Sequence, residues 1–296
     1  MEALSQYNET DTLRRVIIGR YEGYRKVPAY TELVNEEQKK GLPENSLLET
    51  EFKQFRQVLN DAGVEVLVPG YVGKFVYDQL TPRDLGVAIG KRFLICNMAK
   101  KSRRYEVAGI FQFINDERSH EPNVVIPDSP TCFIEGGDII VDKGKVWVGI
   151  SQRTNEEGLD FLAATFGDEF DVIPVYAKAL SEGENVLHLD CMFNPVGENN
   201  ALIYSDGFRE IPKEIKQTYQ LIEVSQQEQQ ALATNVLSLS RNKVISRSHP
   251  DCKRVNNLMR QVGIEVIEIN FNGAPATGGS FRCCTLPLLR TSSPTI

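Results

Sequence analysis

The sequence of 296 residues lacks any run of about 18 or more apolar residues, the length that a helix needs to cross a membrane. It also lacks an excess of basic residues, because its formal net charge is −7 and a nucleic-acid partner would select a basic surface. The opening residues MEALSQYNET contain neither the basic nor the apolar region of a secretory signal. We therefore expect a cytoplasmic protein with no membrane or nucleic-acid partner.

Cysteine and histidine are both scarce. The chain has six cysteines and three histidines, and no two cysteines have the CxxC spacing of a zinc ribbon or a redox dithiol. Without a secretory signal, the cysteines are expected to be reduced thiols. These patterns predict no metal site and no cofactor.

What the sequence does contain is a repeated pattern of strand, strand, helix and strand. In the first cycle, residues 13–19 and 64–68 have strand composition, and four apolar residues between them recur at helical spacing (Leu48, Phe52, Phe55 and Leu59). Similar cycles follow, with strands predicted at 87–90, 93–95 and 124–126; at 138–141, 146–149 and 172–175; at 201–204 and 221–224; and at 236–239, 243–245 and 264–269. About five units of roughly 50 to 60 residues are typical of a closed, propeller-like ring. We predict a single α/β domain over residues 1–296.

Two segments fall outside this repeat. Residues 20–45 are polar and contain Gly23, Pro28, Gly41 and Pro43, without periodicity. Loops of this length are usually functional or disordered, so we interpret the segment as a lid, with simple disorder as the alternative. Residues 291–296 are predicted to be a flexible tail.

The stretch ATGGSFRCCT, residues 276–285, is the strongest candidate for chemistry. Two glycines allow the backbone to approach another group closely, and a cysteine soon after them would lie at the rim of a pocket. Taken alone, the two cysteines are better interpreted as small buried apolar residues.

The rest of the chain offers partners for such a thiol. Asp190 follows His188 by two positions, so both would point to the same side of a strand. A histidine and a carboxylate near a cysteine are typical of an activated thiol nucleophile, with a buried structural histidine as the alternative. Glu135 precedes two glycines, which places it where a strand ends. Arg103 and Arg153 would lie on the surface singly, but together their forked guanidinium groups could hold a carboxylate.

At these residues the sequence resembles the superfamily of guanidino-group-modifying enzymes, which includes arginine deiminases, dimethylarginine dimethylaminohydrolases and amidinotransferases. The resemblance extends from about Leu13 to Leu289 and rests on the following segments, in this order: EGGD at 135–138, SQRTN at 151–155, HLD at 188–190, and the glycines 278–279 followed by CCT at 283–285. It implies a five-bladed α/β propeller of ββαβ modules with pseudo-fivefold symmetry. That fold agrees with the repeated cycles described above.

The resemblance also implies roles for single residues. Cys283 is the nucleophile, with Cys284 a bystander, because the superfamily's cysteine is followed by one residue and then by Ser or Thr. His188 protonates the departing amine and then activates water, and Glu135 assists with proton transfer while it holds the guanidinium. The remaining residues are implied to bind substrate: Asp84 and Asp190 the guanidinium, and Arg103 and Arg153 the α-carboxylate, with Arg104 a less favoured alternative to Arg103.

The activity is left open between several reactions of one superfamily. Asp190 favours an unsubstituted guanidinium, so hydrolysis of L-arginine to citrulline and ammonia is the leading hypothesis. Alternatives are a dimethylarginine dimethylaminohydrolase, an arginine dihydrolase, an amidinotransferase and a non-catalytic arginine-binding protein. In each case the partner is a small guanidino compound, and a homo-oligomer is compatible with the sequence.

Overall fold

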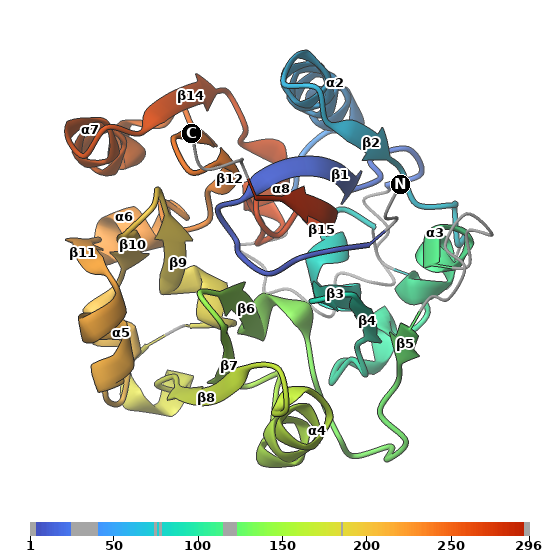
Figure 1. Cartoon of the computed structure of the whole chain (residues 1–296). Coiled ribbons are helices and arrows are strands. Elements are labelled where there is room, and N and C mark those ends of the chain that lie inside the picture. The colour runs from blue at the N-terminus through green and yellow to red at the C-terminus, as the bar shows by residue number, and fades with distance from the viewer. Residues whose placement is uncertain are drawn as a thin grey trace.

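The computed structural model describes residues 4–24, 41–73, 76, 79–114, 123–184 and 186–292, and these residues form five three-stranded sheets around a common centre (Figure 1). The strands are, sheet by sheet, β15 (Thr285–Thr291), β1 (Thr12–Ile18) and β2 (Glu65–Leu67); β3 (Gly86–Ile89), β4 (Arg92–Ile95) and β5 (Asn123–Val125); β6 (Ile139–Asp142), β7 (Lys145–Ile150) and β8 (Asp171–Tyr176); β9 (Phe193–Val196), β10 (Asn200–Ile203) and β11 (Gln220–Glu223); β12 (Leu237–Ser240), β13 (Lys243–Arg247) and β14 (Glu265–Ile269). The predicted five-bladed α/β propeller is confirmed.

The helices lie mainly on the outside of this ring (Figure 1). They are α2 (Asn45–Asp61), α3 (Phe111–Ile114), α4 (Glu156–Phe166), α5 (Lys213–Thr218), α6 (Gln226–Gln230), α7 (Lys253–Gln261) and α8 (Gly273–Ala276). In α2 the four apolar residues predicted to share a face are all buried. The side chain of Asn155, which accepts a hydrogen bond from Gly158 N, caps α4. No helix in the described ranges is long and apolar enough to span a membrane.

Each module follows one topology, which the third shows clearly. Strands β6 and β7 are antiparallel and form a hairpin, whereas β7 and β8 are parallel and are joined through α4. The hairpin turn uses Lys143 and Gly144 with φ of 51° and 72°, the left-handed conformations that suit a two-residue connection between twisted strands.

The ring is closed by the two ends of the chain. The first module takes its inner strand from the C-terminus, since β15 pairs antiparallel with β1, from Thr12 opposite Thr291 to Ile18 opposite Thr285. Thr291 therefore belongs to a strand, so the prediction that the flexible tail begins at residue 291 is wrong for that residue. Residues 293–296 lie outside the described residues, as do 25–40 of the predicted lid.

The centre of the ring holds a buried ionic cluster beneath the N-terminal segment, which crosses the middle of the ring in Figure 1. Glu9 in this segment accepts a hydrogen bond of 3.0 Å from Arg282 Nη2, and its carboxylate lies 3.9 Å from Arg83 Nη1. All three side chains are almost completely buried. The cluster ties the N-terminal segment to the turn that immediately precedes β15.

Candidate active site

A cavity of about 190 Å³ brings together residues from distant parts of the chain. Of the seven residues predicted for the site, five line it: Asp84, Arg103, Arg153, His188 and Cys283. The other two lie directly behind the lining, where Glu135 contacts His188 and Asp190 contacts Cys283. The other lining residues are Thr81, Lys100, Ser102, Glu106, Leu187, Cys191, Thr277 and Gly278.

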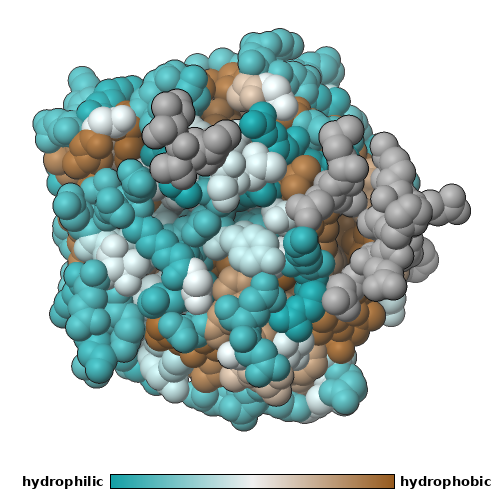
Figure 2. All heavy atoms as spheres, in the orientation of Figure 1, coloured by the Kyte–Doolittle hydropathy of each residue, from teal (hydrophilic) through white to brown (hydrophobic). Residues whose placement is uncertain are grey.

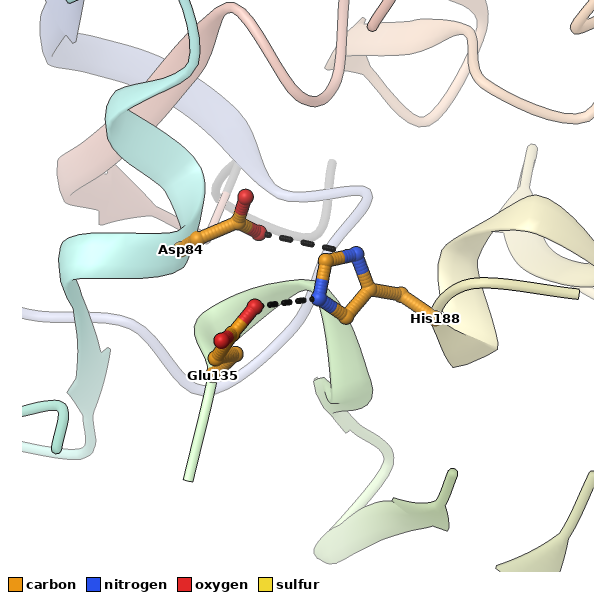
Figure 3. A group of neighbouring side chains, drawn as sticks. All are labelled: Asp84, Glu135 and His188. Carbon is orange, nitrogen blue, oxygen red and sulfur yellow. Dashed lines mark hydrogen bonds and ion pairs between the residues drawn. The ribbon is translucent and has the colours of Figure 1, made fainter. Parts of the chain in front are cut away.

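His188 lies between two carboxylates, as Figure 3 shows. Its Nε2 is 2.8 Å from Glu135 Oε2, and its Nδ1 is 3.8 Å from Asp84 Oδ1. The predicted strand at this position is wrong, because His188 immediately precedes a short 3-10 helix, Leu189–Cys191. That helix is held by Asp138, whose Oδ1 accepts a hydrogen bond of 2.9 Å from Leu189 N.

The electrostatics of this group favour a protonated histidine. Burial alone would lower the pKa of His188, but the Asp84 carboxylate and the hydrogen bond to Glu135 raise it to about 10. Burial would raise the pKa values of Glu135 and Asp84, but the imidazolium and neighbouring arginines lower both. At neutral pH the site therefore contains an imidazolium held by two carboxylates.

The two predicted carboxylate-binding arginines are engaged with acidic residues of the site itself. Arg103 Nη1 donates to Asp84 at 2.6 Å, and its Nε and Nη2 each donate to Glu106 at 2.9 Å. Arg153 Nη1 donates to both oxygens of Glu135, at 3.2 and 3.0 Å. Arg103 thus uses its three nitrogens, whereas the side-chain bonds of Arg153 to the described residues use Nη1 alone.

Cys283 is positioned in the turn before β15 and is 5% exposed. Its Sγ lies 3.7 Å from Asp190 Oδ2 and accepts a hydrogen bond of 3.1 Å from Asn235 Nδ2. Burial, with Asp190, Cys191 and Asp84 nearby, raises the pKa of the Cys283 thiol well above its usual value. At neutral pH this residue is therefore a thiol.

Glycines are required where the motif backbones approach these side chains. A Cβ on Gly137, in the EGGD segment, would lie 2.8 Å from the His188 ring and 2.8 Å from Asp84 Oδ1. A Cβ on Gly279 would lie 3.0 Å from Cys283 Cβ and 2.6 Å from Thr81 Cγ2. Both positions leave no room for a larger residue, which explains one glycine of each pair.

The cluster of Asp84, Glu135 and His188 also has the compactness of a metal site, with ligand atoms within 4.8 Å of one another. Its carboxylates, however, already accept hydrogen bonds from Arg103, Arg153 and the imidazole. A cation entering there would have to replace these positive groups. The donor set is therefore better suited to an organic cation that approaches from the cavity side.

Several site residues were not predicted from the sequence. Ser102 and Glu106 flank Arg103 in sequence and line the cavity, but no sequence pattern assigns a role to either. Lys100 and Asn235 belong to no motif, although Asn235 lies two residues before the buried strand β12. Arg282 is adjacent to Cys283 in sequence, but no motif indicates its role. It is buried, and its Nη1 donates to Asp190 Oδ2 at 2.8 Å.

Raising the pH from 7 to 10 is expected to lower the free energy of unfolding. The pKa of His188 is about 10 in the folded protein and about 6.5 in an unfolded chain. The stabilisation from this proton is therefore complete below pH about 6.5 and is lost as the pH rises through about 10. Chemical denaturation across this range measures the free energy of unfolding at each pH. This free energy should fall less steeply with pH in His188→Gln than in the wild type. It should fall as in the wild type in His249→Gln, because His249 lies outside the cavity. Equal slopes in the two variants would contradict the assignment.

Comparisons with known proteins agree with the site geometry. Residues 29–290 match the model of a family described as N,N dimethylarginine dimethylhydrolase, eukaryotic. The chain is 34% identical over 287 residues to the uncharacterized protein YkgA of Bacillus subtilis, covering 95% of this chain and 94% of that protein. It is 26% identical over 252 residues to an arginine deiminase of Listeria welshimeri, covering 70% of this chain but only 60% of that protein.

Two solved structures share the fold. SxtG, an amidinotransferase from Microseira wollei, superposes with a TM-score of 0.83 at 18% identity and covers 98% of both chains. DDAH from Pseudomonas aeruginosa superposes with a TM-score of 0.72 at 20% identity, covering 94% of this chain and 100% of that one. At such identities the likeness concerns the fold alone.

Proposed function

Because the chain belongs to the family of that model, and so to the guanidino-group-modifying superfamily, we propose that it is a cysteine-dependent hydrolase of arginine-type guanidino compounds. The observation that carries the proposal is that the Cys283 thiol, His188 and Asp84 line one cavity, with Glu135 behind His188. The leading substrate is L-arginine, converted to citrulline and ammonia.

The first step forms a bond between Cys283 Sγ and the guanidinium carbon. That carbon is a weak electrophile because resonance spreads the charge, so a carboxylate that holds the planar group in attack geometry contributes through orientation. Asp84 lines the cavity and fills this role. His188 donates a proton to the departing nitrogen, the C–N bond breaks, and ammonia leaves behind an amidino-thioether.

The second step releases the product. His188, now neutral, accepts a proton from water, which adds to the same carbon, and the C–S bond breaks to give citrulline and the cysteine thiol. One histidine serves both steps because it alternates between acid and base. Glu135 stabilises the imidazolium through the bond at Nε2 and so keeps the ring in place.

A cationic substrate would also promote ionisation of the Cys283 thiol. Burial and the nearby Asp190 raise the pKa of the Cys283 thiol, and a thiolate is the reactive form. A guanidinium beside the sulfur would favour the thiolate by direct attraction, so that the thiol releases its proton to solvent when substrate binds and the thiolate then attacks. Asp190 is fully buried and does not line the cavity, and its contact with the guanidinium remains a prediction.

We expect the carboxylate end of the substrate to meet Lys100 and Arg153, since Arg103 already donates to Asp84, Glu106 and Thr81. Lys100 is exposed at the cavity and forms no ion pair with the described residues. Lys100→Gln should raise KM for L-arginine about tenfold with little change in kcat, because a charge-assisted hydrogen bond is lost. Lys101→Gln, its exposed neighbour outside the cavity, is the matched control. A KM unchanged in Lys100→Gln would contradict this assignment.

A second candidate is amidino transfer to an amine. It is favoured by an L-arginine:L-lysine amidinotransferase of Pseudomonas savastanoi, which is 21% identical over 96% of this chain and 93% of its own length. Transfer and hydrolysis share the first step and differ only in whether an amine or water attacks the amidino-thioether.

Product analysis by mass spectrometry tests the proposal. Purified protein is given L-arginine, asymmetric dimethylarginine, or arginine with glycine or lysine. Citrulline and ammonia from arginine alone would support the deiminase, and ornithine with ammonia and carbon dioxide a dihydrolase. Dimethylamine from the methylated substrate would indicate a dimethylaminohydrolase, and a guanidino product that requires the second amine a transferase. Bound arginine with no product would leave a binding protein.

A further inference from the structure

Asn235 holds Cys283 at two points. Its Oδ1 accepts a hydrogen bond of 3.0 Å from Cys283 N, and its Nδ2 donates to Cys283 Sγ at 3.1 Å. Its backbone carbonyl also accepts from Arg282 N at 3.3 Å. Asn235 is 1% exposed, so these contacts are not shared with bulk water.

The orientation of this amide follows from its partners. The N–H of Cys283 can only donate, so the amide oxygen must face it. The amide NH₂ is then directed at the sulfur, and a flipped side chain would oppose two N–H groups. The Asn235 side chain thus presents a donor, rather than an acceptor, to Cys283.

The turn that carries Asn235 is firmly built. Leu232 adopts φ of 59°, a left-handed conformation that is sterically unfavourable for a bulky residue. Asn194 Nδ2 donates to the carbonyls of Thr234 and Val236, at 2.8 and 2.9 Å, and so clamps both sides of Asn235. Thr234 Oγ1 donates to Cys191 O at 2.9 Å, which attaches the turn to the helix that follows His188.

The electrostatic need for such a donor is evident around the sulfur. Asp190 Oδ2 lies 3.7 Å from Cys283 Sγ, where it can accept from a thiol but would repel a thiolate. Among the described residues, Asn235 provides the hydrogen bond that Cys283 Sγ accepts. A hydrogen bond of this kind favours the charged form of its acceptor.

We propose that Asn235 is the positioning residue of the nucleophile: it fixes the Cys283 sulfur beside the cavity and supplies the N–H that stabilises the thiolate. The inference rests on the proposed function, in which this thiolate attacks the guanidinium carbon. It assigns no contact with substrate to Asn235, which acts through Cys283.

The test measures the ionisation of Cys283 directly. Alkylation by neutral iodoacetamide is followed from pH 6 to 11, and peptide fragmentation separates Cys283 from Cys284. Asn235→Asp keeps an oxygen for the Cys283 N–H but replaces the donor at the sulfur with a carboxylate oxygen. We expect the midpoint of the alkylation profile to rise by about one pH unit or more, which corresponds to about tenfold slower labelling at pH 7.5.

Two further variants make each outcome decisive. Asn235→Ala, which removes both side-chain bonds, should shift the midpoint upward and lower kcat without an equal rise in KM, even if Asn235→Asp does not fold. Asn256→Asp is the control for a buried carboxylate, because this equally buried asparagine contacts Ser246 and Arg247 instead; it should leave the midpoint unchanged. A midpoint unmoved in both Asn235 variants would overturn the inference. If the midpoint moves in the Asn235 variants but the wild-type protein turns over no guanidino substrate, the proposed function fails, and the role of Asn235 in stabilising the Cys283 thiolate stands.

Discussion

Cys283→Ser is expected to abolish turnover of L-arginine, with a loss of about 10⁴-fold or more in kcat, as is typical when a nucleophile is removed. The serine hydroxyl is nearly isosteric but far less acidic than a thiol, and the site contains an imidazolium rather than a free base to deprotonate it. The cavity and its carboxylates are unchanged, so arginine should still bind. Steady-state assays measure the loss, and isothermal titration calorimetry measures the retained affinity.

Cys284→Ser is the matched control for that result. Cys284 is adjacent in sequence but fully buried among apolar side chains, and it does not line the cavity. Its variant should lose some stability but keep kcat within a few-fold. In wild-type protein a cationic haloacetamidine should label Cys283 faster than the other five cysteines, because Asp84 attracts the reagent. Equal labelling of all six, or turnover retained in Cys283→Ser, would refute the assignment.

Much of the fold could be predicted from periodicity alone. Buried strands such as 243–245 and amphipathic α2 have local signatures, and their repetition indicates the modular ring. Ring closure has no such signature, because the pairing of β15 with β1 joins residues at opposite ends of the chain. The segment TLPLLRT also contains a proline, which weakens a strand prediction. Closure is therefore decided by long-range pairing rather than by local composition.

The site could be predicted only where its residues lie in motifs. Cys283, His188 and Glu135 are marked by glycines or acidic neighbours that the close packing requires. Asn235 and Lys100 have no such neighbours in sequence. Asn235 reaches the site from the turn after α6, and Lys100 from the residue before the 3-10 helix at 101–103. The hydrogen bonds of Arg103 to Asp84 and Glu106 could not be predicted either, since the sequence does not show which partner a charged side chain contacts.

The ionic network behind the cavity explains how so many buried charges coexist. Glu9 lies between Arg282 and Arg83, and Arg282 in turn pairs with Asp190 beside the nucleophile. Buried charges are tolerated only when they are paired, and breaking one pair leaves its partner uncompensated. On the surface, by contrast, hydrophilic residues need no such pairing. Figure 2 shows them around separate patches of apolar residues on this face.

His188→Gln is expected to lower kcat by about 10² to 10⁴-fold while arginine still binds. Glutamine can hydrogen-bond Glu135 but cannot deliver or accept a proton, and general acid–base catalysis typically contributes a factor of that size. Loss of the imidazolium also leaves Asp84 and Glu135 with less positive charge nearby, which should tighten binding of a guanidinium. Steady-state kinetics would thus show a low kcat with an unchanged or lower KM.

A substrate with a better leaving group separates the proton-transfer role from a structural one. An S-alkyl isothiourea analogue of arginine expels a thiolate, which does not need a proton from His188. In the His188→Gln variant it should therefore form the amidino-thioether on Cys283, detected as a mass increase of the intact protein. That adduct should then accumulate, because no base activates water for the second step. If the variant forms no adduct, or if it turns over L-arginine at the wild-type rate, His188 is not the acid–base group of this site.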